Sequence, residues 1–224
     1  MVNAPSSRQV GLHRLVVWIG NSLLVTYITL YVWHGLHEFH TIADWTVIPY
    51  LALEVSQAAM ILGHRRARVP AMRWRESAFP FLVTFWMVAA SAVWSWHSAW
   101  GPDTTAVLSW LRLAPVVGGT WAILTLGRNF AMAVEVRQVV QHGVYRYVRH
   151  PIYTAYGLLW IIQVVLFRSW SYTGVVLAGA VLLVVRAHYE DVKLRQADAT
   201  YGQTAHYLLG AQHRAAFLGS RRSS

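Results

Sequence analysis

The sequence predicts an all-helical membrane protein: a polytopic transmembrane bundle of about six spans, the last two forming a short hairpin, plus a cytoplasmic C-terminal helix. Three observations predict this fold. Of the 224 residues, 56% are hydrophobic and only 12% are charged, whereas about 25% are charged in a typical soluble domain. Apolar windows recur along the chain, and their lengths are close to the ~20 residues that a spanning helix needs. The basic residues lie in alternate connections between these windows.

Four of the apolar windows are long enough to cross a bilayer. They are residues 15–37, 45–64, 77–102 and 104–127, and their only charged residues are Glu54 and Arg112. Windows 150–167 and 169–185 are shorter, so four full spans with a shallow or tilted hairpin remain a variant of the six-span bundle. Helices are expected because lipid offers no hydrogen-bond partner to an open backbone.

The positions of the basic residues predict the orientation in the membrane. Connections 65–75 and 128–149 are rich in Arg, whereas connections 34–44 and 98–103 hold no Lys or Arg. Since positively charged loops stay in the cytoplasm, both termini and connection 128–149 are expected there. Lys193 is the only lysine among many arginines, which suggests a GC-rich bacterial genome, so the expected location is a bacterial inner (plasma) membrane. The net charge of +10 then reflects orientation, and no nucleic-acid partner is expected.

The densest polar stretch, residues 137–153, leads into the fifth window. Pro151 suits the first turn of a helix, where its missing N–H is not needed. The free N–H groups and the positive dipole end of that turn favour an anionic group, and Arg149 and His150 add to this preference.

A second polar group follows the sixth window. Arg186 and Glu190 are four residues apart and therefore share one helix face. The hairpin between the two polar stretches goes out and returns, so we expect both stretches to meet at the cytoplasmic face.

Four motifs follow one another in the second half of the chain: Leu-Gly-Arg-Asn-Phe at 126–130, His-Gly-Val-Tyr-Arg-Tyr-Val-Arg-His-Pro-Ile-Tyr at 142–153, Glu190-Asp191 with Leu194, and Tyr201-Gly202. This pattern resembles that of the isoprenylcysteine carboxyl methyltransferase and phospholipid methyltransferase superfamily, and the resemblance covers about residues 120–210. It implies an integral-membrane methyltransferase that uses S-adenosylmethionine. The implied acceptor is lipophilic or membrane-bound (a carboxylate, an amine or a thiol-derived group), either a small molecule or a lipid-anchored substrate, and membrane lipids are implied as partners.

The resemblance also implies roles for residues of this chain. Arg186 and Glu190 are the expected catalytic residues. The expected cofactor-binding residues are Gly143, Val144, Tyr145, Arg149, His150, Pro151, Tyr153, Glu190 and Asp191. Arg186 would orient an anionic acceptor or hold Glu190, and both roles stay open.

We expect one membrane domain over residues 1–224. Residues 1–127 would form four N-terminal spans on the substrate side, residues 128–210 the cofactor-binding region, and residues 211–224 a tail. Glu54 lies near the middle of the second window, where a carboxyl group is costly. It is explained either by a structural hydrogen bond or by a role at the substrate site.

Two alternatives to a methyltransferase remain at this stage. One is a nicotinamide-dependent membrane reductase of the sterol-reductase type, and the other is a non-enzymatic membrane protein. His34, His37 and His40 have a helical spacing that could bind a metal. We interpret them as polar residues that end the first span, and no metal site is predicted.

Overall fold

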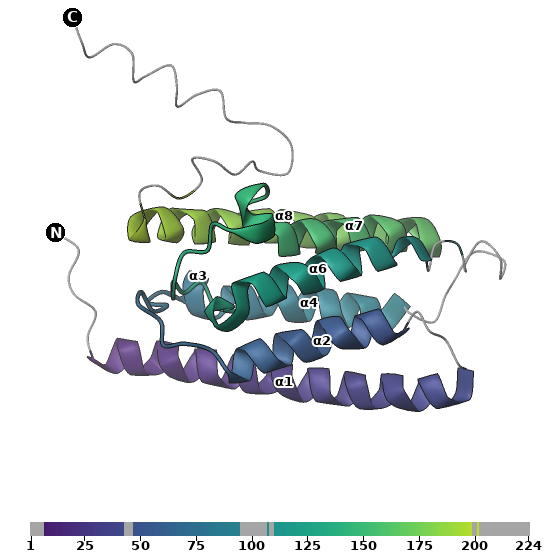
Figure 1. Ribbon diagram of the computed structural model, residues 1–224, viewed down its shortest axis with the longest axis horizontal. Helices are drawn as coiled ribbons and strands as arrows, with labels where there is room; N and C mark the ends of the chain where they lie inside the picture. Colours follow the sequence, from purple (N-terminus) through teal and green to yellow (C-terminus); the bar gives the residue numbers. More distant parts are fainter. Residues whose placement is uncertain (1–6, 43–46, 95–106, 108–109, 199–200, 202–224) are drawn as a thin grey trace, which may run out of the picture.

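The computed structural model describes residues 7–42, 47–94, 107, 110–198 and 201, and the regular elements of these residues are helices. The long helices lie side by side along one axis (Figure 1). They are α1 (Ser7–Ile42), α2 (Val47–Leu62), α4 (Phe79–Trp94), α6 (Leu113–Leu126), α7 (Pro151–Phe167) and α8 (Trp170–Ala197). Short helical turns α3 (Trp74–Ser77), η1 (Gly127–Asn129) and η2 (Gly143–Arg146) lie in the connections. The all-helical class is confirmed for this part of the chain.

Each predicted apolar window contains a long helix, but the bundle of about six spans is not confirmed. By length and composition, two helices of the described residues could cross a membrane, over Val10–Trp33 and Trp170–Ala197. The apolar stretches Ile48–Leu62 and Pro151–Phe167 are shorter.

The last helix corrects the prediction of a short second hairpin arm over residues 169–185. Helix α8 has 28 residues and continues without a break through Arg186, Glu190 and Lys193. At ~1.5 Å per residue it is about 42 Å long, more than the hydrocarbon core of ~30 Å. The polar continuation forms because residues 186–197 are mostly strong helix formers and include no Gly or Pro.

Small residues bring the helices close together. The position where a Cβ atom of Gly20 would lie is 2.7 Å from the ring of Phe81, so this glycine leaves room for a side chain of α4 against α1. A Cβ atom at Gly119 would lie 3.3 Å from that of Ala155, so α6 packs tightly on α7. Close approach of this kind suits a membrane bundle, in which packing rather than the hydrophobic effect holds helices together.

Large apolar side chains also cover the outside of the bundle. Trp18, Leu30, Trp121, Ile161 and Val184 are each more than half exposed, and they come from four different helices. A soluble monomer rarely exposes such extended apolar surface, so this surface suits contact with lipid.

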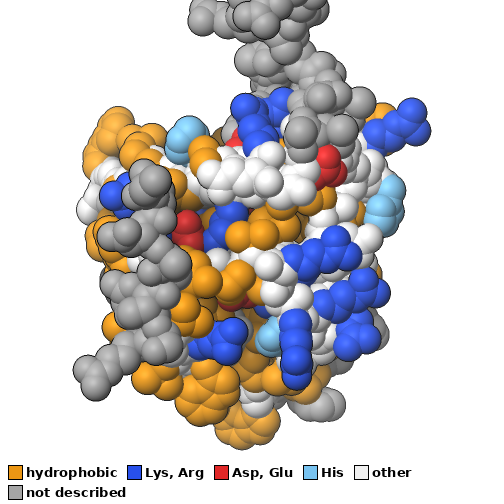
Figure 2. Space-filling model, turned by 90° about the vertical axis from the view of Figure 1, so that its left-hand side faces the viewer, with side chains coloured by type: hydrophobic (Ala, Val, Ile, Leu, Met, Phe, Trp, Pro, Cys, Tyr) orange, Lys and Arg blue, Asp and Glu red, His pale blue; other side chains and the backbone are white. Residues whose placement is uncertain are grey.

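The two Arg-rich connections meet at one end of the bundle. The backbone N–H of Arg65 donates to the carbonyl of Arg128 at 2.9 Å, and Val69 exchanges two hydrogen bonds with Val136. Near the start of α1, His13 lies 3.0 Å from the Ser77 hydroxyl, so the beginning of α1 is at the same end. Figure 2 shows this end, with Lys and Arg side chains spread over it.

Candidate active site

A cavity of about 330 Å³ extends from the basic end of the bundle into its interior. Its volume is within the usual range for small-molecule sites. The wall includes residues from α1, α2, α4, α7 and α8 and from the connection between α6 and α7. Both halves of the chain therefore build one site. Of the sequence-predicted residues, those in the wall are Glu54, Tyr145, Arg149, His150, Pro151, Tyr153, Arg186 and Glu190.

The turn η2 positions Tyr145 at the outer end of the cavity. Gly143 begins this turn with a φ of +59°, and a Cβ atom there would lie 2.9 Å from the Thr125 side chain. Both features require glycine. The hydroxyl group of Tyr145 is buried and has no hydrogen-bond partner among the described residues. Burial, followed by the nearby Glu190 and Tyr201, raises the pKa of Tyr145 well above its ordinary value, so the hydroxyl stays protonated.

The start of α7 brings Arg149 and His150 to Asp191 of α8. Nε2 of His150 lies 2.9 Å from Oδ1 of Asp191, and a guanidinium nitrogen of Arg149 lies 3.8 Å from Oδ2. Asp191 is buried and does not line the cavity itself. Asp191 therefore contacts Arg149 and His150 from outside the cavity wall.

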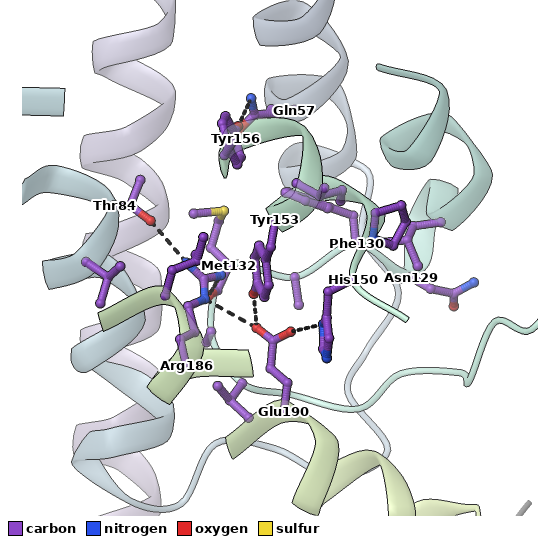
Figure 3. Close-up of a pocket in the computed structure, with 18 of the residues that line it drawn as sticks. Gln57, Thr84, Asn129, Phe130, Met132, His150, Tyr153, Tyr156, Arg186 and Glu190 are labelled. Atoms are coloured by element: carbon purple, nitrogen blue, oxygen red, sulfur yellow. Dashed lines mark hydrogen bonds and ion pairs between the residues drawn. The ribbon is translucent and has the colours of Figure 1, made fainter. Parts of the chain in front are cut away.

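Glu190 lies on the cavity side of the same helix turn and is the centre of the site (Figure 3). Its carboxylate accepts hydrogen bonds from the hydroxyl group of Tyr153 and, at 3.3 Å, from Nε of Arg186. Its other oxygen lies 3.9 Å from Nδ1 of His150, whose ring stacks on that of Tyr153 at 5.3 Å. The expected meeting of residues 143–153 with residues 186–191 is therefore confirmed.

The guanidinium group of Arg186 is surrounded by protein acceptors. It donates to the carbonyl of Pro80 at 3.3 Å, to the hydroxyl of Thr84 at 3.2 Å and to the carbonyl of Met132 at 2.8 Å. With Glu190 as the fourth partner, most of its five N–H donors are used. This geometry favours the role of holding Glu190 over that of binding an acceptor.

Glu54 lies at the inner end of the cavity, with Tyr27, Tyr31 and Tyr50 in the same wall. Between these residues and Tyr153, Gln57 donates a 2.8 Å hydrogen bond to the hydroxyl of Tyr156. No hydrogen bond or ion pair joins Glu54 to another described residue. The structural hydrogen bond that would explain this carboxyl group is therefore not found within that part of the chain.

Sequence reasoning assigned no role to Asn129 or Tyr201, although it quoted both within motifs. Asn129 lines the cavity, and its buried side-chain oxygen has no hydrogen-bond partner among the residues that the structure describes. The hydroxyl of Tyr201 donates to Asp191 at 3.1 Å. Burial, and then the charge of Asp191, raises the pKa of Tyr201 above its ordinary value, so it remains a donor.

The sequence analysis also assigned no structural role to Lys193. Its being the only lysine among many arginines was the one feature that set it apart. It is buried, and Nζ donates to the carbonyl of Pro70 at 2.8 Å, to Glu76 at 2.6 Å and to the carbonyl of Val134 at 3.0 Å. Lys193, which also lines the cavity, thereby connects α8 to both basic connections.

The histidine group predicted to end the first span is only partly described. The side chains of His34 and His40 lie outside the described residues, and the ring of His37 stacks on Trp33 at 6.3 Å. Among the residues with a described position, no group of three or more His, Asp or Glu side chains is placed to hold a metal ion.

Residues 110–196 match the model of the isoprenylcysteine carboxyl methyltransferase family. The resemblance stated from the motifs is thus confirmed over this segment, which includes η2, α7 and nearly all of α8. The match is to a family of methyltransferases and supports an enzyme. Glu54 and the helices α1, α2 and α4 lie outside the matched residues. No curated protein and no solved structure matches the chain.

Proposed function

We propose that the protein is an integral-membrane methyltransferase that transfers a methyl group from S-adenosylmethionine to a lipophilic acceptor. The observation that carries this proposal is the meeting of Tyr145, His150 and Glu190 around one cavity end, within the segment that matches the family. The cavity continues inward between apolar helices, which suits an acceptor supplied from the membrane. We further propose that the basic end faces the cytoplasm of a bacterium, following the positive-inside rule.

The outer end of the cavity fits the polar groups of the cofactor. The hydroxyl of Tyr145 and the side-chain oxygen of Asn129 are buried without partners among described residues, and such groups are costly unless a ligand or water binds them. Arg149, His150 and the N–H groups after Pro151 suit a carboxylate. The carboxylate of Glu190 suits an amino group or ribose hydroxyls.

Three of the predicted residues, Gly143, Val144 and Asp191, do not line the cavity and would support its outer end indirectly. Gly143 and Val144 shape the backbone that presents Tyr145. Asp191 orients Arg149 and His150 through its contacts with them. When bound, S-adenosylmethionine supplies a methyl group on a sulfonium, which needs no further activation.

The protein's contribution is therefore to position the reactants and to exclude water. Tyr153 and Arg186 keep the Glu190 carboxylate in one orientation, because each bonds to the same oxygen. Arg186 is fixed in turn by backbone carbonyls of two other segments. In this mechanism Arg186 is a positioning residue, and residues 128–210 supply the cofactor side while residues 1–127 supply the acceptor side.

Calorimetric titration of the detergent-solubilised protein with S-adenosylmethionine tests the proposal. The wild type should bind, and Glu190→Ala should abolish binding. A matched control is Asp198→Ala, which removes another carboxylate of the same helix end, one that accepts from Gln141 and does not line the cavity. It should keep the affinity of the wild type. Equal affinity of the Glu190→Ala protein, or binding of a nicotinamide cofactor in place of S-adenosylmethionine, would contradict the proposal.

A further inference from the structure

The inner end of the cavity contains polar groups that the proposed cofactor site does not use. We call this region the inner chamber and define it by Glu54, Tyr27, Tyr31 and Tyr50, all of which line the cavity. Glu54 makes no hydrogen bond or ion pair with the described residues. The hydroxyl of Tyr50 is buried and likewise lacks a hydrogen-bond partner among them. Two unsatisfied polar groups in one chamber indicate a ligand that binds there.

The inner chamber lies directly beyond the proposed cofactor end. Tyr153 bonds to Glu190, and Tyr156, three residues further into the bundle, bonds to Gln57. Figure 3 shows Tyr153 between Glu190 and the Gln57–Tyr156 pair. On α2, Glu54 is three residues deeper than Gln57. At ~1.5 Å per residue, each step is about 4.5 Å, so Glu54 lies about 9 Å inward of the level of Tyr153. A ligand group bound at Glu54 would therefore lie beside the proposed cofactor site, on its inner side.

The surroundings of Glu54 select the kind of group that can bind. Its neighbours in the wall include Leu24 and Leu53, and an unpaired carboxylate in such surroundings is costly. A charged group from another part of the chain also lies near the chamber, since the guanidinium of Arg112 is 5.6 Å from the centre of the Tyr50 ring. A ligand group that donates a hydrogen bond would satisfy Glu54. A carboxylate ligand would be repelled by it.

We propose that the inner chamber binds the methyl acceptor through a hydrogen-bond-donating nucleophile, a hydroxyl or an amine on a lipophilic body, and that Glu54 takes its proton. This inference rests on the proposed methyltransferase function. In the step, the electron pair of the acceptor oxygen or nitrogen forms the new bond to the methyl carbon. The methyl–sulfur bond breaks with its electrons left on sulfur, and the proton of the acceptor passes to the carboxylate of Glu54. A carboxylate acceptor would have no proton to give.

Binding of three matched amphiphiles tests the chemistry of the chamber without the cofactor. Octan-1-ol, octylamine and octanoate share one chain length and differ in the head group. Calorimetric titration of the solubilised protein should give at least ~10-fold tighter binding of octan-1-ol, octylamine or both than of octanoate, which corresponds to ~1.4 kcal/mol. Which of the first two binds identifies the acceptor as a hydroxyl or an amine. Equal binding of all three, tightest binding of octanoate, or no binding would overturn the inference.

Variants of Glu54 show whether this residue makes the selection. Glu54→Gln should bring the three affinities to within about threefold of one another, since the like-charge repulsion of octanoate is removed. Glu54→Asp keeps the charge and should keep the order. Glu135→Gln is a matched control, because Glu135 lines the cavity but is already paired with Arg137 at 3.1 Å. It should bind the three amphiphiles as the wild type does. An unchanged preference in Glu54→Gln would overturn the role of Glu54.

A second readout separates this inference from the proposed function. Glu54→Gln should bind S-adenosylmethionine with the affinity of the wild type, while transfer of labelled methyl to the preferred amphiphile falls at least ~100-fold, as for loss of a general base. If the wild type fails to bind S-adenosylmethionine but still selects octan-1-ol or octylamine, the proposed function fails and the selective chamber stands. If methyl ester forms on octanoate in preference, the function stands and the inference fails.

Discussion

Tyr153 donates a hydrogen bond to Glu190 and thereby joins the first turn of α7 to the polar end of α8. The two residues are 37 positions apart in the sequence, at the two ends of a helical hairpin. The same carboxylate accepts from Arg186, which is held by carbonyls of Pro80 and Met132. Glu190 is therefore the point at which the segment matching the family is connected to the rest of the bundle.

Tyr153→Phe should weaken the binding of S-adenosylmethionine at least ~10-fold, because one hydrogen bond to a charged group contributes about 1.5 kcal/mol. Glu190 would keep Arg186 as a partner, so binding should not vanish. Tyr147→Phe is the matched control, since Tyr147 is exposed and lies outside the cavity wall. Calorimetry on the three proteins checks this prediction, and equal affinities would refute a role for the Tyr153–Glu190 bond.

Gly143→Ala should destabilise the protein and weaken cofactor binding. The left-handed φ of +59° costs an L residue about 1–2 kcal/mol, and the added methyl group would also meet Thr125. Gly118→Ala in α6 should be neutral or slightly stabilising, because nothing lies within 4 Å of its Cβ position and alanine favours helix. Melting temperatures of the Gly143→Ala and Gly118→Ala proteins in the same detergent test this prediction. Equal melting temperatures would mean that η2 accommodates alanine without strain and would contradict it.

Lys193→Met should destabilise the protein by about 3 kcal/mol, since it removes one partner of a largely buried ion pair. Glu76 and the carbonyls of Pro70 and Val134 would then lose their shared donor. The double variant Lys193→Met, Glu76→Gln should recover part of the loss, because no unpaired charge remains. Chemical denaturation gives the free energy of unfolding of the two variants and so measures this recovery. Equal free energies of unfolding would contradict a role for the Lys193–Glu76 ion pair.

The stability conferred by Glu76 should depend on pH in the acidic range. Burial alone would raise the pKa of this carboxyl group, but hydrogen bonds from Lys193 and from the N–H of Met72 lower it below its ordinary value of 4.5. A carboxyl group with a lowered pKa stabilises the folded state above its unfolded pKa. That stabilisation is lost as the pH falls below 4.5 and through the folded pKa. The melting temperatures of wild type and Glu76→Gln should therefore converge under acid, and a constant difference would contradict this.

Much of the fold was predictable because hydropathy acts locally. A run of about 20 apolar residues predicts a helix whatever its neighbours are, and a helix does lie at each predicted window. The length of α8 was missed because the hydropathy of residues 186–197 falls while their helix propensity does not. The meeting of residues 143–153 with 186–191 was predictable because a hairpin returns the chain to the side from which it left.

The amino-acid sequence by itself determined the helical class, the basic end and the outer residues of the candidate site, because each depends on local composition, spacing or motif. Only the tertiary structure decided which side chains face the cavity. That Arg186 binds Pro80, and that Asp191 stands behind His150 while Glu190 faces inward, depends on how each helix is rotated against its neighbours. That rotation comes from packing, for example at Gly20 on Phe81, and packing joins residues far apart in the chain.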